Sequence, residues 1–289
     1  MTTLRFTKGH GTQNDFVLLM DPTGEIDLTP DLVRFLCDRR AGIGADGVIR
    51  AITAEHLAAG AAFAPGTWFM DYWNADGSTS EMCGNGARVF AAFIERDARV
   101  DLSQGLGIGT RGGPRTVTAV GDGRYAVGMG KFRMADASGA FDAQVAARGL
   151  VPERPALFVD MGNPHHVVAL GSDDELDGLD LSAAPVVTPP PPAGTNVEFA
   201  VARAAQVRDG VARGSVRMRV HERGSGETRS CGTGACAVAL AVRSWAGAGA
   251  PDVWDVEVPG GLVTVTIDGD TTVLEGPAVL VADGEVTAP

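Results

Sequence analysis

Alternating apolar and polar residues form the most common pattern along this chain, and such alternation predicts β-strands. The clearest examples are residues 4–7, 16–20, 115–120, 216–220 and 262–267. Turn-forming runs separate several of them, for example Gly121-Asp-Gly123 and Asp268-Gly-Asp270. Strongly helical stretches are fewer, so strands should outnumber helices.

A helix is predicted over residues 29–40, because Thr29 can cap its start and Pro30 suits the first helical position. Two further apolar runs of helical type cover residues 88–94 and 236–242. The proline-rich run 188–194 can be neither helix nor central strand, which predicts a stiff connecting loop.

A duplicated motif precedes each of those two apolar runs. Cys83-Gly-Asn-Gly-Ala87 and Cys231-Gly-Thr-Gly-Ala235 share the pattern Cys-Gly-x-Gly-Ala, and their cysteines are 148 positions apart in a chain of 289 residues. Each cysteine should therefore lie at or just before a helix N-terminus. Asn74 and Glu222 each lie nine residues before their cysteine. This repeat predicts two halves of similar fold, with equivalent helix ends meeting at a shared cleft.

Composition narrows the class of protein. A hydrophobic content of 45% predicts a globular protein with about two domains. A net charge of −12 is opposite to the basic surface that nucleic-acid binding needs. The first residues show no secretory leader, and the apolar stretch 231–250 contains Arg243, which argues against a membrane span. We therefore expect a reduced, cytoplasmic protein in which each of the four cysteines needs its own explanation.

The motif cysteines suit proton-transfer chemistry. A thiol at a helix N-terminus feels the positive end of the helix dipole, which should lower its pKa from about 8.5. The glycine after each cysteine lets a carboxylate approach the exposed amides. Two such sites facing each other would place sulfurs on opposite faces of the attached α-carbon. One thiolate could then remove the α-proton while the opposing thiol donates another, and no cofactor would be needed.

Other uses of the cysteines fit less well. A metal site is not expected, because four residues separate Cys231 from Cys236 and no Cys-x-x-Cys occurs. Thiol hydrolysis would need one cysteine with a histidine, such as His165 or His221, and would leave the duplicate unexplained. We assign Cys37 and Cys236 to packing.

Taken together, the motifs resemble those of the diaminopimelate epimerase family over essentially the whole chain. The matching segments, in the same order as in the family, are residues 8–16, 42–46, 74–78, 83–88, 161–165, 195–197, 222–228, 231–236 and 274–278.

The resemblance implies inversion of LL-2,6-diaminopimelate to its meso isomer, a step of lysine and peptidoglycan precursor synthesis that uses neither pyridoxal phosphate nor metal. It implies that Cys83 and Cys231 are the two bases, and that His165 and Glu222 lie beside the α-amino group and the thiols. Other residues would bind substrate. The reacting carboxylate would be bound by the amides of Gly84, Asn85, Gly232 and Thr233, with Asn14 at the same end. The amino groups and the far head would be surrounded by Asn74, Asn163, Asn196, Glu222 and Arg223.

The implied fold is an α/β (α+β) duplication, in which each half wraps a curved, mostly antiparallel sheet around a central helix. We expect an N-terminal domain over residues 1–125, to which residues 277–289 return, and a C-terminal domain over residues 126–276. Family members are typically homodimers, so a homodimer is expected, without nucleic-acid or membrane partners.

The chain departs from the family's pattern at two positions. Many members carry Gln directly after the Asp that corresponds to Asp46, where this chain has Gly47. Gly47 has no side chain with which to make the substrate contact that this glutamine makes in the family. Val89 stands where a further Cys is frequent, and we expect no catalytic consequence.

Two rival functions remain open. A proline or hydroxyproline racemase would share the two-thiol logic, although Arg223 and the asparagine set favour a substrate with a second polar head. A redox-sensing or small-molecule binding protein would instead form a reversible disulfide between Cys83 and Cys231, with no turnover.

Overall fold

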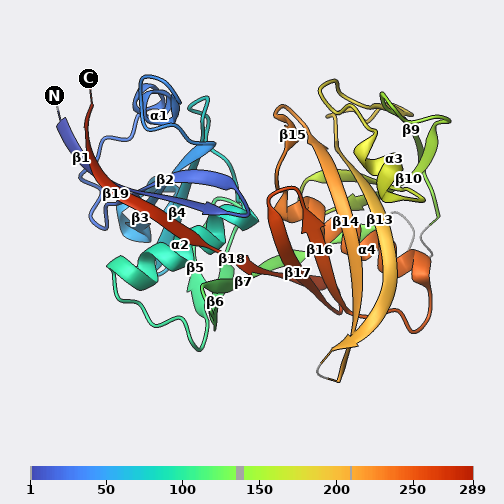
Figure 1. The fold of residues 1–289 in the computed structure, drawn as a ribbon. Helices are drawn as coiled ribbons and strands as arrows, with labels where there is room; N and C mark the ends of the chain where they lie inside the picture. The colour runs from blue at the N-terminus through green and yellow to red at the C-terminus, as the bar shows by residue number, and fades with distance from the viewer. Residues whose placement is uncertain (1, 135–139, 209, 289) are drawn as a thin grey trace. The chain divides into compact units, whose positions relative to one another are not determined.

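The computed structural model describes residues 2–134, 140–208 and 210–288. The chain forms two compact units (Figure 1). Unit 1 comprises Met1–Gly128 and Gly276–Pro289, and unit 2 comprises Met129–Glu275. Both boundaries fall within strands, in β7 (Arg124–Lys131) and in β18 (Thr271–Pro277). The C-terminal strand therefore belongs to the same unit as the N-terminal one.

Unit 1 is built on a sheet with the strand order β19-β1-β2-β3-β4. Its members are β19 (Val279–Ala288), β1 (Thr2–Gly11), β2 (Asn14–Met20), β3 (Gly47–Thr53) and β4 (Trp68–Asn74). Neighbours are antiparallel except β2 and β3, which are parallel and are joined through α1 (Pro30–Cys37). The 3-10 turns Ala54–His56 and Ala58–Gly60 follow β3, and β5 (Leu106–Ile108) and β6 (Arg115–Gly121) lead into β7.

Helix α2 (Gly84–Asp97) is the central helix of unit 1. It packs against β1, β2, β3 and β19, and every residue from Gly84 to Ile94 is buried. A helix that is buried on all sides needs small residues where neighbours approach closely, and its first turn supplies glycine and alanine. This packing fixes the N-terminus of the helix, where Cys83 lies.

Unit 2 contains a longer sheet with the strand order β12-β9-β10-β11-β13-β14-β16-β17-β18. Most pairs are antiparallel, and β11 with β13 and β14 with β16 are parallel. The bounds are β8 (Arg133–Met134), β9 (Ala143–Ala146), β10 (Arg154–Asp160), β11 (Pro164–Ala169), β12 (Val186–Thr188), β13 (Asn196–Arg208), β14 (Val211–Glu222), β15 (Gly226–Thr228), β16 (Val253–Val258) and β17 (Gly261–Asp268).

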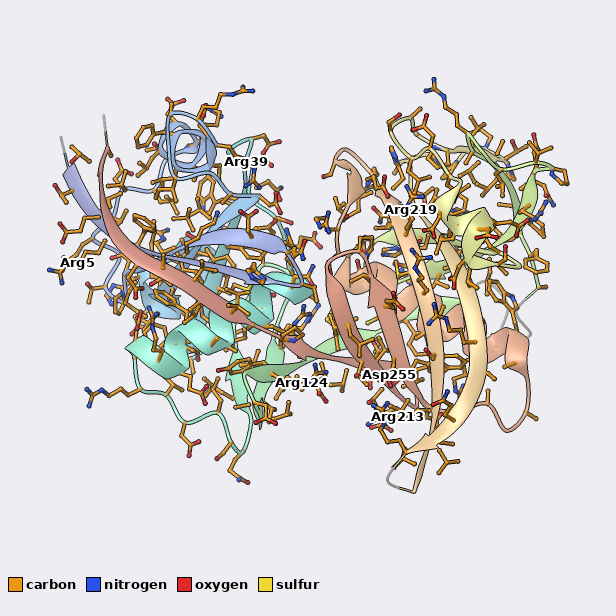
Figure 2. The ribbon with its side chains drawn as sticks, in the orientation of Figure 1. Arg5, Arg39, Arg124, Arg213, Arg219 and Asp255 are labelled. Carbon is orange, nitrogen blue, oxygen red and sulfur yellow. The ribbon has the colours of Figure 1, made fainter. Side chains whose placement is uncertain are left out.

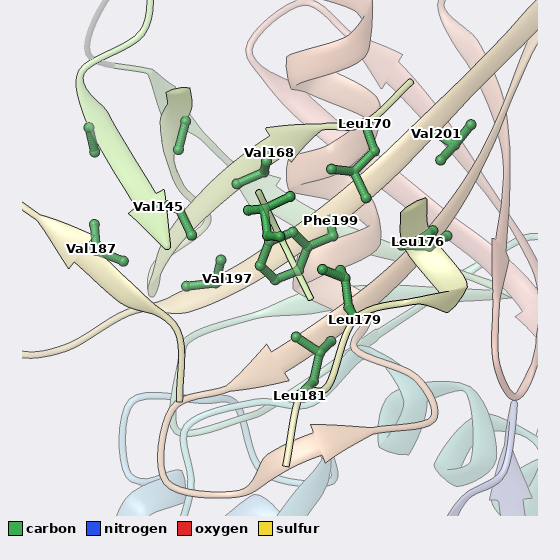
Figure 3. Packing of buried hydrophobic residues seen from close by; sticks show 13 residues of the cluster. Val145, Val168, Leu170, Leu176, Leu179, Leu181, Val187, Val197, Phe199 and Val201 are labelled. Atoms are coloured by element: carbon green, nitrogen blue, oxygen red, sulfur yellow. The ribbon is translucent and has the colours of Figure 1, made fainter. Parts of the chain in front are cut away.

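Helix α4 (Gly232–Ala246) occupies the central position in unit 2, packed against β10, β11, β13, β14, β16 and β17. A hydrophobic core cluster of unit 2 lies around Phe199 of β13, where Val168, Leu179 and Leu181 surround the ring (Figure 3). The short helix α3 (Asp173–Asp177) contributes to the same cluster through Leu176. Polar contacts also join the strands: Arg213 of β14 donates to Asp255 of β16 at 3.1 Å (Figure 2).

The expected α/β fold is confirmed, with strands predominating and a central helix in each unit. All five predicted strands form, and Cys83 and Cys231 each occupy the N-cap of a helix, as the duplicated motif predicts. The helix predicted over residues 29–40 begins as expected, with Thr29 as its cap, but ends at Cys37. Asp38 stops it, because its carboxylate accepts hydrogen bonds from the backbone N–H groups of Arg40 and Ala41.

Candidate active site

The duplicated motif adopts the same local geometry in both units. Gly86 N–H donates to Cys83 Sγ at 3.4 Å, and Gly234 N–H donates to Cys231 Sγ at the same distance. The backbone carbonyl of each cysteine also accepts the first intrahelical bond, from Ala87 at 2.8 Å and from Ala235 at 2.9 Å. Each sulfur is therefore held at the positive end of a helix dipole.

In unit 1, the side chain of Asn14 connects the thiol of Cys83 to neighbouring polar groups. Asn14 Oδ1 accepts from Cys83 Sγ at 3.6 Å and from Asn85 Nδ2 at 3.3 Å. Asn14 Nδ2 donates to Asp46 Oδ2 at 2.8 Å. Arg88, fully buried, donates to Asn85 Oδ1 at 2.9 Å and so fixes that amide. Cys83, Asn14 and Asn85 thus form one continuous network.

A cluster of charged side chains is connected to this network through Asp46. Arg39, labelled in Figure 2, donates to Asp46 at 2.8 Å and to Asp15 at 2.7 Å. Lys8 donates to Asp15 at 2.7 Å as well. Burial alone would raise the pKa of Asp15, but the hydrogen bonds and charges of Arg39 and Lys8 hold that pKa well below its ordinary value. The sequence argument did not include Asp15, Arg39 or Asp46 among the site residues.

Asn74 lies at the end of β4, opposite Gly47 of β3. Its Nδ2 donates to Ser78 Oγ at 3.0 Å. A Cβ atom at position 47 would lie 2.5 Å from the carbonyl oxygen of Trp73 and 2.8 Å from the ring of Tyr72. Glycine is therefore required by the close approach of β4, and the glutamine common in the family would not fit here without movement of the strand.

In unit 2, two polar side chains lie beside the thiol of Cys231. Its Sγ is 3.5 Å from Thr233 Oγ1, and it shares a hydrogen bond with the carboxylate of Glu222. The hydroxyl of Thr228 donates to the same carboxylate. Burial raises the pKa of Glu222 above its ordinary value, against the effect of these two hydrogen bonds.

The pKa of the Cys231 thiol is shifted in the opposite direction from the sequence-based prediction, in which a helix N-terminus lowers it. Burial raises the pKa of Cys231 well above its ordinary value, and the carboxylates of Glu222 and Glu198 raise it further. The hydrogen bonds from Thr233 and Gly234 act in the opposite direction but are outweighed. The raised pKa favours the protonated thiol over the thiolate.

His165 is completely buried and is held at both ring nitrogens. Its Nδ1 is 2.7 Å from Glu198 Oε1, and its Nε2 is 3.0 Å from Asn163 Oδ1. Asn163 Nδ2 in turn donates to Thr233 Oγ1 at 3.5 Å. Glu198 was missed in the sequence, although a signal existed: an acidic residue between the apolar residues Val197 and Phe199.

Asn196 and Arg223 lie together in another part of unit 2. The side chain of Asn196 donates to the carbonyl of Pro164 at 2.9 Å and accepts from the backbone N–H of Arg223 at 3.0 Å. Arg223 Nη1 donates to the carbonyl of Ala193 at 2.9 Å. Arg223 also lines a cavity of about 440 Å³, together with Thr195 and Val197.

The predicted site residues therefore fall into three local groups. Unit 1 brings together Cys83, Gly84, Asn85 and Asn14, with Asn74 at the end of a nearby strand. Unit 2 brings together Cys231, Gly232, Thr233, Glu222, His165 and Asn163, and places Asn196 beside Arg223. Among the described residues, no group of three or more His, Cys, Asp or Glu side chains is arranged to hold a metal ion. No helix in the described ranges is long and apolar enough to cross a membrane.

Comparison with known proteins decides the family. The family model described as diaminopimelate epimerase matches residues 6–135 and 157–281, which is most of the chain. The chain belongs to the diaminopimelate epimerase family. It is 45% identical to the diaminopimelate epimerase of Streptomyces coelicolor, over 98% of this chain and 96% of that protein. Identity to the diaminopimelate epimerase of Mycobacterium avium is 46%, over 98% and 97% of the two chains.

Solved structures with the same fold come from more distant proteins. A phenazine biosynthesis protein of the PhzF family from Bacillus anthracis superimposes with a TM-score of 0.66 at 14% identity, covering 100% of both chains. A hydroxyproline epimerase from Agrobacterium vitis gives a TM-score of 0.64 at 15% identity, covering 99% of this chain and 91% of that one. At these identities the likeness establishes the fold of this chain and nothing about its substrate.

Proposed function

We propose that this isomerase of the diaminopimelate epimerase family inverts LL-2,6-diaminopimelate to the meso isomer with two cysteine bases and no cofactor. Cys83 and Cys231 act on opposite faces of one α-carbon. The observation that carries the proposal is the matching backbone geometry of the two sulfurs, each of which accepts a glycine N–H at 3.4 Å at the N-cap of a buried helix.

The reacting carboxylate binds at the two helix ends. Backbone N–H groups at a helix N-terminus, here from Gly84 and Asn85 in one unit and Gly232 and Thr233 in the other, are natural donors to an anion. Negative charge grows on this carboxylate as the α-proton leaves. The helix ends therefore stabilise the carbanion-like transition state more than the ground state, which is what lowers the barrier.

The proton balance requires one sulfur to begin as thiolate and the other as thiol. Cys231, buried beside Glu222, is suited to begin as the thiol that donates a proton to the carbanion. Cys83, which is only partly buried, then begins as the thiolate that removes the α-proton. In the reverse direction the two cysteines exchange their roles as base and acid. Glu222 and His165 accommodate the α-amino group beside the thiols.

The far end of the substrate carries a second ammonium and a second carboxylate. We assign its recognition to Asn74, Asn163, Asn196 and Arg223, with Asn14 at the reacting end. Arg223 suits a carboxylate because its planar guanidinium can donate two parallel hydrogen bonds. Its guanidinium is already tethered to the carbonyl of Ala193, which limits the conformations it must lose on binding.

A stereospecific assay in deuterated water tests this function. We expect solvent deuterium at the α-carbon of diaminopimelate, starting from either the LL or the meso isomer, and no exchange of proline or hydroxyproline. Exchange of the cyclic amino acids alone would favour a racemase. A disulfide between Cys83 and Cys231 without any exchange would favour a redox sensor, and either result would refute the proposal.

We also propose that the enzyme works as a homodimer in the cytoplasm. The family's typical assembly supports the dimer, and the need for reduced cysteines supports the compartment. Light scattering coupled to size-exclusion chromatography measures the mass directly. The 29.8 kDa chain should elute at about twice its mass, and a mass of one chain would contradict the dimer.

A further inference from the structure

The turn between β1 and β2 leads directly into Asn14 and has a backbone conformation that its residues do not favour. Gly11 pairs with Asn14 across the two strands, so Thr12 and Gln13 alone form the loop. Their φ values are 50° and 64°, as a two-residue hairpin turn of type I′ requires. Such turns usually contain Asn-Gly or Asp-Gly, and a β-branched residue such as Thr12 is an outlier at positive φ. Contacts with the rest of unit 1 must therefore hold this turn.

The turn between β6 and β7 has the same backbone with favourable residues. There Gly121 pairs with Arg124, and the two central residues are Asp122 and Gly123, with φ values of 52° and 67°. Glycine adopts positive φ without a steric cost, so this turn needs no support from other elements. The comparison indicates that the turn at Thr12 has its sequence for a reason other than ease of folding.

Arg88 of α2 is the buried side chain that contacts the turn at Thr12. Both side chains are buried, and Arg88 Nη2 donates to Thr12 Oγ1 at 3.3 Å and to Asn85 Oδ1 at 2.9 Å. The guanidinium is held in place by two carbonyl groups as well, since Nη1 donates to Gly84 and Nε donates to Pro277, each at 3.4 Å. One rigid group thus contacts both the turn and the first turn of α2.

The same guanidinium sets the orientation of the amides beside Cys83. A guanidinium can only donate, so the oxygen of the Asn85 amide faces Arg88 and its nitrogen is directed at Asn14. Asn85 Nδ2 donates to Asn14 Oδ1 at 3.3 Å, and that oxygen also accepts from Cys83 Sγ at 3.6 Å. A Cβ atom at Gly11 would lie 3.1 Å from Arg88 Nη2, which shows how closely the turn packs on this group. Two routes therefore lead from Arg88 to the oxygen of Asn14, one through the turn and one through Asn85.

We propose that Arg88 is a positioning residue that holds Thr12 and Gln13 at positive φ and so directs the amide oxygen of Asn14 at the sulfur of Cys83. Its hydrogen bond to Thr12 is effective because the donor is charged and buried. Without that bond the turn relaxes toward negative φ and moves Asn14, the next residue. The proposal deepens the proposed function, on which its kinetic consequences rest. Once Cys83 has taken the α-proton it is a thiol, and a thiol can donate to this oxygen.

The first test needs no substrate. Thr12→Val removes the hydroxyl that accepts from Arg88 and keeps the β-branched shape. Nitrogen-15 NMR follows solvent exchange of the Asn14 side-chain amide protons, and Asn14→Ala assigns that signal among the five asparagines of the chain. We expect exchange to be about tenfold faster in Thr12→Val, the effect of one hydrogen bond to a charged group. Unchanged exchange in Thr12→Val would overturn the proposal, whatever the enzyme turns over.

Glycine at position 13 should rescue the loss. Gln13 is exposed, so Gln13→Gly removes no buried contact, and glycine adopts the turn conformation without support from Arg88. Added to Thr12→Val, it should return the exchange rate of Asn14 to that of the unmodified protein. A double variant that exchanges as fast as Thr12→Val would overturn the proposal.

The second test is the rate of diaminopimelate inversion. Thr12→Val should lower kcat by about tenfold with KM nearly unchanged, and adding Gln13→Gly should bring kcat back to within about threefold of the unmodified enzyme. Arg88→Lys keeps the charge but loses the planar fork, so kcat should fall by about a hundredfold. Gln13→Gly should restore only part of that loss, because the contact with Asn85 stays broken. If Arg88→Lys does not fold, Thr12→Val with and without Gln13→Gly decides alone.

Two controls make the same changes elsewhere. Thr272→Val removes a buried hydroxyl that has no hydrogen-bond partner within the described part of the chain, and it should leave kcat unchanged. Asp122→Gly relieves positive φ in the turn between β6 and β7, and added to Thr12→Val it should restore nothing. A loss of kcat that Gln13→Gly does not restore, or that Asp122→Gly restores equally, would overturn the proposal. The expected exchange pattern in a protein that inverts no diaminopimelate would support the role of Arg88 and refute only the proposed function.

Discussion

Asn14 Nδ2 donates to Asp46 Oδ2 at 2.8 Å, and this bond leaves the amide oxygen of Asn14 toward the sulfur of Cys83. Removing the acceptor with Asp46→Ala should let the amide of Asn14 rotate, so that its nitrogen competes for the sulfur. We expect kcat to fall by about tenfold, the cost of one hydrogen bond to a charged group, with little change in KM. Steady-state kinetics of both directions measures this. Asp31→Ala, which removes an exposed carboxylate from α1, is the control and should have no effect.

The four cysteines should respond differently to substitution. Cys83→Ala or Cys231→Ala should abolish inversion, because each removes one of the two bases. Cys37→Ala and Cys236→Ala should leave it nearly intact: both side chains are buried in packing, and burial raises the pKa of Cys37 to about 12. Conversion of the LL to the meso isomer is the measurement. Equal activity across all four variants would contradict the assignment.

Glu222→Gln should separate activity from stability. Burial raises the pKa of Glu222 in the folded protein, so its contribution to stability is present below the ordinary carboxyl pKa and is lost as pH rises through the folded value. At pH 7 the glutamine variant, which avoids a buried charge, should be more stable than the unmodified protein, and at about pH 4 the two should converge. Activity should fall by about a hundredfold or more. Urea unfolding at both pH values decides the sign, and a variant less stable at pH 7 would disprove it.

Asp15→Asn should show the opposite pH dependence. Arg39 and Lys8 overcome the effect of burial and hold the pKa of Asp15 low, so its contribution to stability is present above the ordinary value near 4 and is lost as pH falls. We expect the variant to be less stable by about 1–3 kcal/mol at pH 7, with the difference shrinking below about pH 4. Unfolding curves across this range are the measurement. A pH-independent difference would show that packing, not charge, is what the variant loses.

Gly47→Gln should fail to restore the family's glutamine contact. The side chain would have to displace the carbonyl of Trp73, so we expect a loss of about 1–3 kcal/mol of stability and lower activity through the displaced end of β4. Gly47→Ala should behave in the same direction. Gly107→Ala is a suitable control, because a Cβ there meets nothing within 4 Å. Thermal unfolding is the measurement, and a Gly47→Gln protein as stable and active as the original would refute the steric argument.

Local patterns in the sequence were sufficient to predict local structure. The alternation in residues 216–220 predicted a strand that forms within β14, and the motif at Cys231 predicted a helix that begins there. Both follow from interactions between near neighbours, which sequence spacing records directly. The start of α1 was predicted and its end was not, because the side-chain bonds of Asp38 compete with helix continuation over a few residues.

The candidate site depended on both the sequence and the tertiary structure. The sequence by itself determined the pair of N-cap cysteines and the family, because a repeated motif can be recognised without any knowledge of packing. Tertiary structure alone decided that Glu198 pairs with His165, that Arg39 reaches Asp46, and that the pKa of Cys231 is raised rather than lowered. Desolvation and ion pairing depend on which groups from distant strands approach one another, and no local spacing in the chain encodes that distance.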